Sequence, residues 1–323
     1  MSTMQLIIDT HGVSIRVRGG AFLISGKEGK RSVSPKLIDG IMVMSDCMIS
    51  SDAIRLAISS GIPMLFFDAM GGASGRIWSA QFDRLPIVRR NQVLFERDRP
   101  EAAVWAAGLY RMKAEGQIAN IAGYDAHHAG IEKMKALLPD FEGELWRNVP
   151  DFEEKIMILE AQVARYYWDA LRELLPKGYA FNKRSRQPAE DIFNAALNYL
   201  YGMLYNTVEG AVFAAGLDPF LGIVHADEYN KPTLVFDLIE PYRTWIDKML
   251  IDLCRSEQLE ARHFDFENTA VRLNKDGKHL LIPAYEALMN GEIFWQEQQA
   301  SVRNHIFRHI WAFSAVLEKY EPV

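Results

Sequence analysis

The segment Ala214–Asp247 reads AAGLDPFLGIVHADEYNKPTLVFDLIEPYRTWID and decides what kind of fold surrounds it. A helical run opens the segment, and Pro219 cannot continue it. A short apolar run then ends at His225, and a polar loop leads into a second expected helix with Asp237 and Glu240 in its first turn. Because these two carboxylates are three residues apart, they project from one helical face. The segment therefore predicts a helical environment that holds acidic groups near an imidazole.

Segments at helical spacing, rich in Ala, Leu, Met and Glu, continue on both sides of this segment. One exception is Ala270–Ile282, where the turn residues Asn274 to Gly277 lie between apolar runs and predict a β-hairpin. We therefore expect residues 96–323 to form a large all-α domain. The expected helices cover Glu101–Ala122, Asp151–Leu175, Ala189–Gly216, Asp237–Cys254 and Phe294–Leu317.

The N-terminal part of the chain has a different pattern, with short runs of apolar and β-branched residues separated by glycine-containing turns. One helix interrupts these runs, capped by Ser50 or Ser51 and ended by Gly61. The fold class is therefore α+β, with a small β-sandwich-like domain with one helix over residues 1–83, a linker over 84–95, and the larger all-α domain. The expected strands are Met4–Asp9, Val13–Val17, Ala21–Ser25, Ile38–Met44 and Met64–Asp68.

Composition and charge exclude several classes of protein. Hydrophobic residues make up 49% and charged residues 24%, as in globular proteins, and no apolar run is long enough for a membrane span. The N-terminus lacks the pattern of a secretory signal, and two cysteines, Cys47 and Cys254, are too few for a disulfide framework. We therefore expect a cytoplasmic protein. A net charge of −6 argues against a general nucleic-acid coat, although a DNA enzyme can concentrate its basic residues along one track.

Four side chains are candidates for a metal site. A metal that activates phosphodiester chemistry needs hard oxygen ligands, sometimes with an imidazole. Asp237, Glu240 and His225 can meet at one point if the loop folds back onto the helix. Glu160 lies among mostly apolar neighbours at helical spacing, where a carboxylate must be paired, protonated or bound to a metal.

Each of these residues also has a purely structural explanation. Asp237 and Glu240 have the spacing of a capping box. His225 at the end of an apolar run is typical of a hydrogen-bonded core histidine. Glu160 is equally compatible with a helix-surface carboxylate or a salt-bridge partner. Spacing alone leaves these alternatives open.

Five short motifs follow one another in a specific order. They are Glu160-Ala-Gln-Val-Ala164-Arg-Tyr-Tyr167-Trp168, Leu197-Asn198-Tyr199-Leu200-Tyr201, the turn Ala215–Pro219, the run Leu221–His225, and Asp237–Arg243 with Asp247 beyond. In this order they resemble the CRISPR-associated integrase and endonuclease family of spacer acquisition. The N-terminal β region and the hairpin expected near Asn274 agree as well, so the resemblance covers most of the chain. Leu200 departs from the family pattern, in which a small residue is common at this position.

The resemblance implies that Glu160, His225 and Glu240 bind a catalytic Mg²⁺ or Mn²⁺, with Asp237 as an acidic neighbour in the site. The imidazole favours manganese. The implied reaction is transesterification, in which the 3′-hydroxyl of a short duplex DNA fragment attacks a phosphodiester at a CRISPR repeat boundary. Water in place of that hydroxyl gives endonuclease activity. The implied partners are a second copy of the chain, bound through the β domain, and a small ferredoxin-like acquisition protein.

Competing functions are a stand-alone metal-dependent nuclease, a transposon-type integrase of the same fold, and a catalytically silent nucleic-acid-binding subunit.

A DNA substrate requires positive charge beside the metal site. For any one candidate DNA-binding residue, a solvated surface charge or a core aromatic is the alternative interpretation. The basic candidates are Lys183, Arg184, Arg186, Arg84, Arg243 and Lys248, with Arg89, Arg90, Arg303, Arg308 and His309 as further ones, and Tyr166, Tyr199 and Tyr201 are candidates for stacking on splayed bases.

Overall fold

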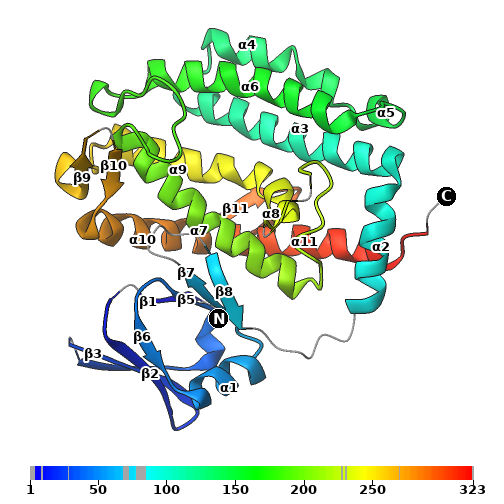
Figure 1. Ribbon diagram of the computed structural model, residues 1–323. Coiled ribbons are helices and arrows are strands. Elements are labelled where there is room, and N and C mark those ends of the chain that lie inside the picture. Colours follow the sequence, from blue (N-terminus) through cyan, green and yellow to red (C-terminus); the bar gives the residue numbers. More distant parts are fainter. Residues whose placement is uncertain are drawn as a thin grey trace. The chain divides into compact units, whose positions relative to one another are not determined.

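The chain divides into two units, Met1–Asp83 and Arg84–Val323, which are described separately (Figure 1). In this computed structural model the described residues are 4–8, 10–27, 29–67, 73–77, 85–226, 228–229, 231–268 and 270–321. Within those ranges, none of the helices is long and apolar enough to cross a membrane.

The first unit contains two four-stranded sheets and one helix, α1 (Ser51–Ser59). One sheet has the order β1-β5-β7-β8, with β1, β5 and β7 parallel and β8 antiparallel to β7. The other has the order β4-β3-β2-β6, with β6 parallel to β2. All five predicted strands are present. The strands are β1 (Met4–Ile8), β2 (Val13–Arg18), β3 (Ala21–Gly26), β4 (Gly29–Val33), β5 (Ile38–Val43), β6 (Cys47–Ile49), β7 (Met64–Phe67) and β8 (Ala73–Ile77).

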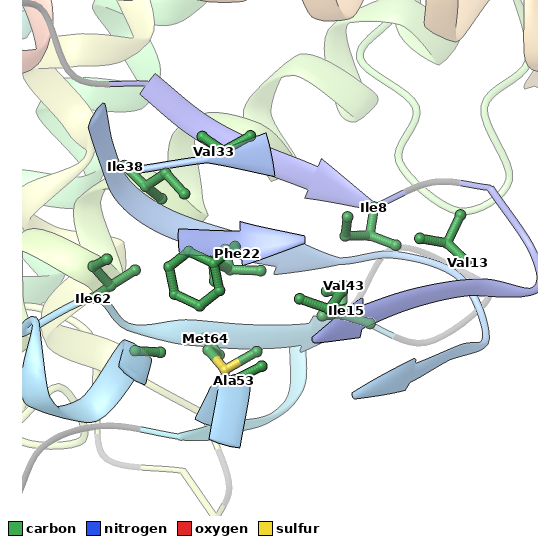
Figure 2. Close-up of a cluster of buried hydrophobic side chains, with 12 residues drawn as sticks. Ile8, Val13, Ile15, Phe22, Val33, Ile38, Val43, Ala53, Ile62 and Met64 are labelled. Carbon is green, nitrogen blue, oxygen red and sulfur yellow. The ribbon is translucent and has the colours of Figure 1, made fainter. Parts of the chain in front are cut away.

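Apolar side chains from both sheets and from α1 meet in one core (Figure 2). Ile15 on β2 and Phe22 on β3 are fully buried, as are Met64 on β7 and Ala53 on α1. Alternation along each strand turns these side chains to one face, because successive residues of a strand point to opposite sides. The β-sandwich-like unit with one helix is thus held together by apolar packing.

The second unit is mainly helical, and α3 (Arg99–Tyr124) runs between α6 (Phe152–Leu174) and α9 (Arg243–Arg255) (Figure 1). Its remaining α-helices are α2 (Leu85–Arg97), α4 (Ala129–Lys135), α5 (Gly143–Trp146), α7 (Ile192–Ala214), α8 (Thr233–Leu238), α10 (Lys275–Asn290) and α11 (Val302–Glu318). Short 3₁₀ turns include η4 (Glu240–Tyr242), between α8 and α9. Two small sheets pair β9 (Phe264–Glu267) with β10 (Ala270–Leu273) and β11 (Glu292–Trp295) with β12 (Gln298–Ser301). The predicted α+β class is confirmed, with these two hairpins added to the helical unit.

The hairpin predicted at Ala270–Ile282 is wrong. Strand β10 pairs with the preceding β9, and Asn274 caps α10 by accepting the backbone N–H of Gly277 at 3.1 Å. The polar tetrad from Asn274 to Gly277 is therefore a helix start, because its asparagine oxygen satisfies a free N–H of the first turn. The apolar residues after it follow helical spacing, and Leu281, Tyr285 and Met289 are buried.

Three other boundaries also differ from the predictions. The expected linker over 84–95 is helical from Leu85 onward, as part of α2. The expected helix Phe294–Leu317 begins only at Val302, because the hairpin β11–β12 precedes it. The expected helix from Asp237 is divided into α8, η4 and α9, and Pro241, which has no N–H, lies at the interruption.

Candidate active site

Two glutamates from different elements face the same lysine. Glu160 lies in the middle of α6, Glu240 opens η4, and Lys113 reaches them from α3. The ammonium of Lys113 donates to Oε1 of Glu160 and to Oε2 of Glu240, each at 2.5 Å. The side chains of Lys113 and Glu240 are only 12% and 9% exposed, so this cluster is largely shielded from water. The structure thus brings together the two glutamates that the sequence singled out.

A close helix contact fixes the position of Lys113. A Cβ atom at Gly116 on α3 would lie 2.6 Å from Oγ1 of Thr244 on α9, so only glycine allows these helices to approach as they do. One turn further along α3, Asn120 donates to the carbonyl oxygen of Thr244 at 2.7 Å and to the hydroxyl of Tyr167 at 3.2 Å. Because Lys113 precedes Gly116 by about one turn, the same contact sets its side chain opposite Glu240.

Asp237 organises the loop that carries His225. Its carboxylate is fully buried and accepts the backbone N–H groups of Ile223 (2.7 Å), Val224 (3.1 Å) and His225 (3.1 Å). The same carboxylate lies 2.7 Å from Nδ1 of the His225 ring. A ring held through Nδ1 presents Nε2 to another partner. The capping-box interpretation of Asp237 is therefore wrong, because this residue binds the preceding loop instead of a helix start.

Glycine is also required in the loop before His225. A Cβ atom at Gly222 would lie 2.4 Å from the backbone oxygen of His225 and 2.8 Å from side-chain atoms of Thr233. The hydroxyl of Thr233 donates to the carbonyl oxygen of Phe220 at 3.0 Å, which holds the start of α8 against the loop. The Leu-Gly run that precedes His225 in the sequence thus has a steric cause.

Charges in the glutamate cluster balance. Burial alone would raise the pKa of Glu240, but Arg243 and Lys113 lower it to about 2. Burial acts to lower the pKa of Lys113, but Glu240 and Glu160 outweigh it and raise the pKa above its ordinary value. Arg243 donates from Nε to Oε1 of Glu240 at 3.0 Å. The carboxylate of Glu240 and the two cations beside it therefore favour one another's charged forms in a space with little water.

Asp247, a second buried acid, is linked to Arg243 through Tyr201. Asp247 accepts hydrogen bonds from the hydroxyls of Tyr201 at 2.6 Å and Tyr167 at 3.0 Å. Burial raises the pKa of Asp247 to about 6, against the lowering effect of the two tyrosines. The guanidinium of Arg243 lies 4.6 Å from the centre of the Tyr201 ring. Asp247, Tyr201 and Arg243 thus form a chain of contacts that ends at Glu240.

The predicted DNA-binding residues take different positions. Arg184 and Arg243 flank the ring of Tyr201, whose hydroxyl is bonded to Asp247. Contact with DNA stays a prediction for every one of these residues, and Arg84 lies outside the described residues. Lys183 pairs with Glu190 at 3.8 Å, Arg186 is exposed, Lys248 pairs with Asp252 at 2.8 Å, and Tyr166 has Arg165 5.1 Å from its ring centre.

No group of three or more His, Cys, Asp and Glu side chains is arranged to hold a metal ion in the part of the chain that the structure describes. Glu160 and Glu240 turn toward Lys113, while His225 is near enough to Glu240 to contribute to the lowered pKa of that carboxyl. Two carboxylates and an imidazole are donors that suit Mg²⁺ or Mn²⁺. The residue types therefore fit a divalent metal, with an ammonium lying between the two carboxylates.

Sequence reasoning missed Lys113. On α3 it follows the buried Leu109 and Tyr110 and precedes the buried Gln117 and Asn120. Polar residues at this spacing on the buried face of a long helix were the available signal, since a buried charge requires partners. No motif pointed to the lysine itself.

Comparison with known proteins identifies the family. The sequence model of the family described as CRISPR associated protein Cas1 matches residues 6–287. The chain belongs to the Cas1 family. This membership confirms the resemblance found in the sequence.

Related proteins match this Cas1-family chain over nearly its whole length. A protein of Archaeoglobus fulgidus, named CRISPR-associated endonuclease Cas1 1, is 26% identical over 341 residues and covers 98% of this chain and 98% of its own. A casposase bound to its integration product has a TM-score of 0.80 at 23% identity, over 100% of this chain and 92% of the casposase. A chain of a Cas6-RT-Cas1–Cas2 complex has a TM-score of 0.80 at 17% identity, over 98% of this chain and 35% of that one. These structures show that the fold is shared.

Proposed function

We propose that this Cas1-family protein is a metal-dependent DNA endonuclease and integrase that inserts short duplex fragments into a CRISPR repeat array. One observation carries the proposal. Glu160 and Glu240, from separate elements, converge on one cation position, and the adjacent His225 ring is oriented by Asp237. The name of the Archaeoglobus relative and the integration product bound to the casposase support the same class of chemistry.

The proposed reaction exchanges one phosphodiester for another. The 3′-oxygen of the incoming fragment forms a bond to phosphorus, the bond to the former 3′-oxygen breaks, and the proton passes to this leaving oxygen. With water as the attacking group, the same exchange is hydrolysis. A divalent metal held by Glu160, His225 and Glu240 would polarise the phosphoryl oxygens and lower the pKa of the attacking hydroxyl. Mg²⁺ and Mn²⁺ are the proposed metals, because they suit two carboxylates and an imidazole.

The residues around the ligands have supporting roles in this proposal. Asp237 holds the His225 ring through Nδ1 and fixes the backbone before it, so Nε2 keeps one direction. Arg243 keeps Glu240 ionised and in place. Lys183, Arg184 and Lys248 remain candidates for contact with DNA phosphates.

The protein is proposed to act in an assembly. The fold shared with a chain of a Cas6-RT-Cas1–Cas2 complex supports a complex with a small ferredoxin-like acquisition partner, and we propose a homodimer formed through the β unit. Double-stranded fragments and repeat DNA are the proposed substrates. A cytoplasmic location follows from these substrates.

An integration assay with purified partner, labelled fragment and repeat DNA tests the function. Wild-type protein is expected to join fragment to repeat in the presence of Mn²⁺, and Glu160→Ala and His225→Ala are expected to abolish both joining and cleavage of branched DNA. Glu154→Ala, at an exposed position of the same helix, is the matched control and is expected to retain activity. Undiminished activity in Glu160→Ala would overturn the proposed site.

The casposase likeness favours one second candidate, a transposon-type integrase. The two candidates differ in target choice. Insertion at repeat boundaries in preference to unrelated duplex DNA supports spacer acquisition, whereas equal insertion into both supports the transposon-type activity. A folded protein that binds DNA but joins and cleaves none of these substrates would be the silent subunit.

A further inference from the structure

We propose that the ammonium of Lys113 occupies the cation position between Glu160 and Glu240 when no metal is bound, and that metal binding displaces it. The inference rests on the proposed function, because it assumes that these glutamates are metal ligands. It assigns to Lys113 the role of a positioning residue that keeps the ligand carboxylates together and competes with the metal for them.

The first observation is geometric. One nitrogen atom lies 2.5 Å from an oxygen of each glutamate, so the two carboxylates are turned toward a single point that already contains a positive charge. In the described part of the chain, His, Cys, Asp and Glu side chains form no ready-made group of three for a metal. The carboxylates are thus arranged around the ammonium, and a metal bound to the same two oxygens would take the place where that ammonium now lies.

The second observation is the charge of the cluster. The side chains of Glu160, Glu240, Lys113 and Arg243 are 24%, 9%, 12% and 19% exposed, and their formal charges cancel. Two carboxylates facing each other without a cation between them would repel strongly in such a site. A divalent ion added beside the ammonium would instead leave an excess of positive charge that burial makes costly. Exchange of one cation for the other keeps a cation between the carboxylates, and it leaves a smaller excess of positive charge than a metal added beside the ammonium would.

The third observation concerns the remaining contacts. Glu240 keeps Arg243 on its other oxygen, at 3.0 Å, so it does not depend on Lys113 alone for a partner. The lysine stem is anchored on α3, whose close contact with α9 is made by Gly116 and is independent of the ammonium. Displacement therefore requires rotation of one flexible side chain while both helices stay in place.

Calorimetric titration with MnCl₂ tests the inference on the full chain. Lys113→Met removes the charge and keeps an unbranched stem, and it is expected to bind Mn²⁺ at least about tenfold more tightly than wild type, because the competing cation is gone. Lys135→Met, at an exposed position on α4, is the matched control and is expected to leave Mn²⁺ affinity unchanged. In chelator the Lys113→Met protein is expected to unfold at a lower temperature than wild type, and saturating Mn²⁺ is expected to remove most of that difference.

The outcomes separate this inference from the function on which it rests. Equal or weaker Mn²⁺ binding by Lys113→Met than by wild type overturns the role of Lys113 while leaving the metal site in place. Binding by Lys113→Met where wild type binds none supports the inference in its strongest form. Absence of Mn²⁺ binding by both proteins contradicts the proposed metal dependence itself. Lys113→Gln is the second variant, and failure of both variants to fold in saturating Mn²⁺ also overturns the exchange.

Discussion

The β unit and the helical unit bury different kinds of side chain. In the described part of Met1–Asp83 the buried residues of the core are apolar, and Ile15, Phe22 and Ile41 are fully enclosed. The buried polar and charged side chains, Asp237, Glu240 and Asp247 among them, belong to Arg84–Val323. Burying a charge lowers stability unless partners compensate. The buried charges among the described residues thus lie in the helical unit, whereas the described core of the β unit is apolar.

The largest expected effect is a loss of activity while the helical unit stays folded. Glu240→Gln keeps the shape of the side chain but removes its charge and replaces one accepting oxygen with an NH₂ donor. We expect integration to fall by about 10³-fold, because an amide oxygen is a weak ligand for a divalent ion and a poor partner for two cations. Steady-state joining assays measure this loss, and circular dichroism verifies the fold. Retention of more than a tenth of the activity would contradict the role of Glu240.

Truncation of a side chain in the apolar core tests how far the stability of the β unit depends on packing. Phe22→Ala is expected to lower the free energy of unfolding of the β unit by about 3–5 kcal/mol, through lost burial and the cavity left behind. Hydrogen exchange followed by mass spectrometry should show lost protection in the first unit and unchanged protection along α3 and α6. Met48→Ala, at a position that is 66% exposed, is the control. Equal loss of protection in both units would show that they unfold together.

Asp247 gives the helical unit a pH dependence that the β core lacks. Its pKa is raised from 3.8 to about 6 in the folded protein, so its contribution to stability is fully present below pH 3.8 and is lost as the pH rises through 6. Relative to Asp247→Asn, the free energy of unfolding of wild type should therefore fall by about 2 kcal/mol between pH 4 and pH 7. Urea unfolding of both proteins across this range measures the difference. A constant difference would mean that Asp247 titrates normally.

A surface charge should have the smallest effect. Lys248 pairs with Asp252 at an exposed position, so Lys248→Ala is expected to change the free energy of unfolding by less than about 0.5 kcal/mol. If Lys248 contacts a DNA phosphate, the slope of log affinity against log salt should decrease by about 1 in this variant. Fluorescence anisotropy at several salt concentrations measures that slope. An unchanged slope would remove Lys248 from the DNA-binding candidates.

Local pattern predicted much of the fold. Alternation in residues such as those around Ile15 and Phe22 places the strands of the β core, and helical spacing predicts α3, α6 and α7 to within a few residues at each end. Strands β4, β6 and β8 were missed in the first unit. The segments GKRSV and ASGRI carry little apolar signal, and β6 has only 3 residues. The hairpin at Asn274 was mistaken because an asparagine before a glycine is typical of both a turn and a helix cap, and only tertiary packing decides between them.

The site was predictable only in part. The motifs singled out Glu160 and Glu240, and the structure brings them to one point. Their role as metal ligands stays a prediction. The role of Asp237 was not found, because a carboxylate that binds three N–H groups of a loop leaves no periodic trace in the sequence. Lys113 was missed because its partners lie on other helices, and the spacing of one helix says nothing about its neighbours. Long-range electrostatic pairing is the information that a single sequence lacks.

The attachment of the His225 loop has a consequence for how this part of the chain can vary. Asp237 grips the backbone from Ile223 to His225, ahead of the connection to α8. The direction of the His225 ring therefore depends on Asp237 and not on the length of the connection that follows His225. Insertions or deletions between Ala226 and Pro232 should change the length and charge of this connection without turning the His225 ring. If the proposed function holds, divergence among homologues can concentrate there while the direction of the His225 ring stays constant.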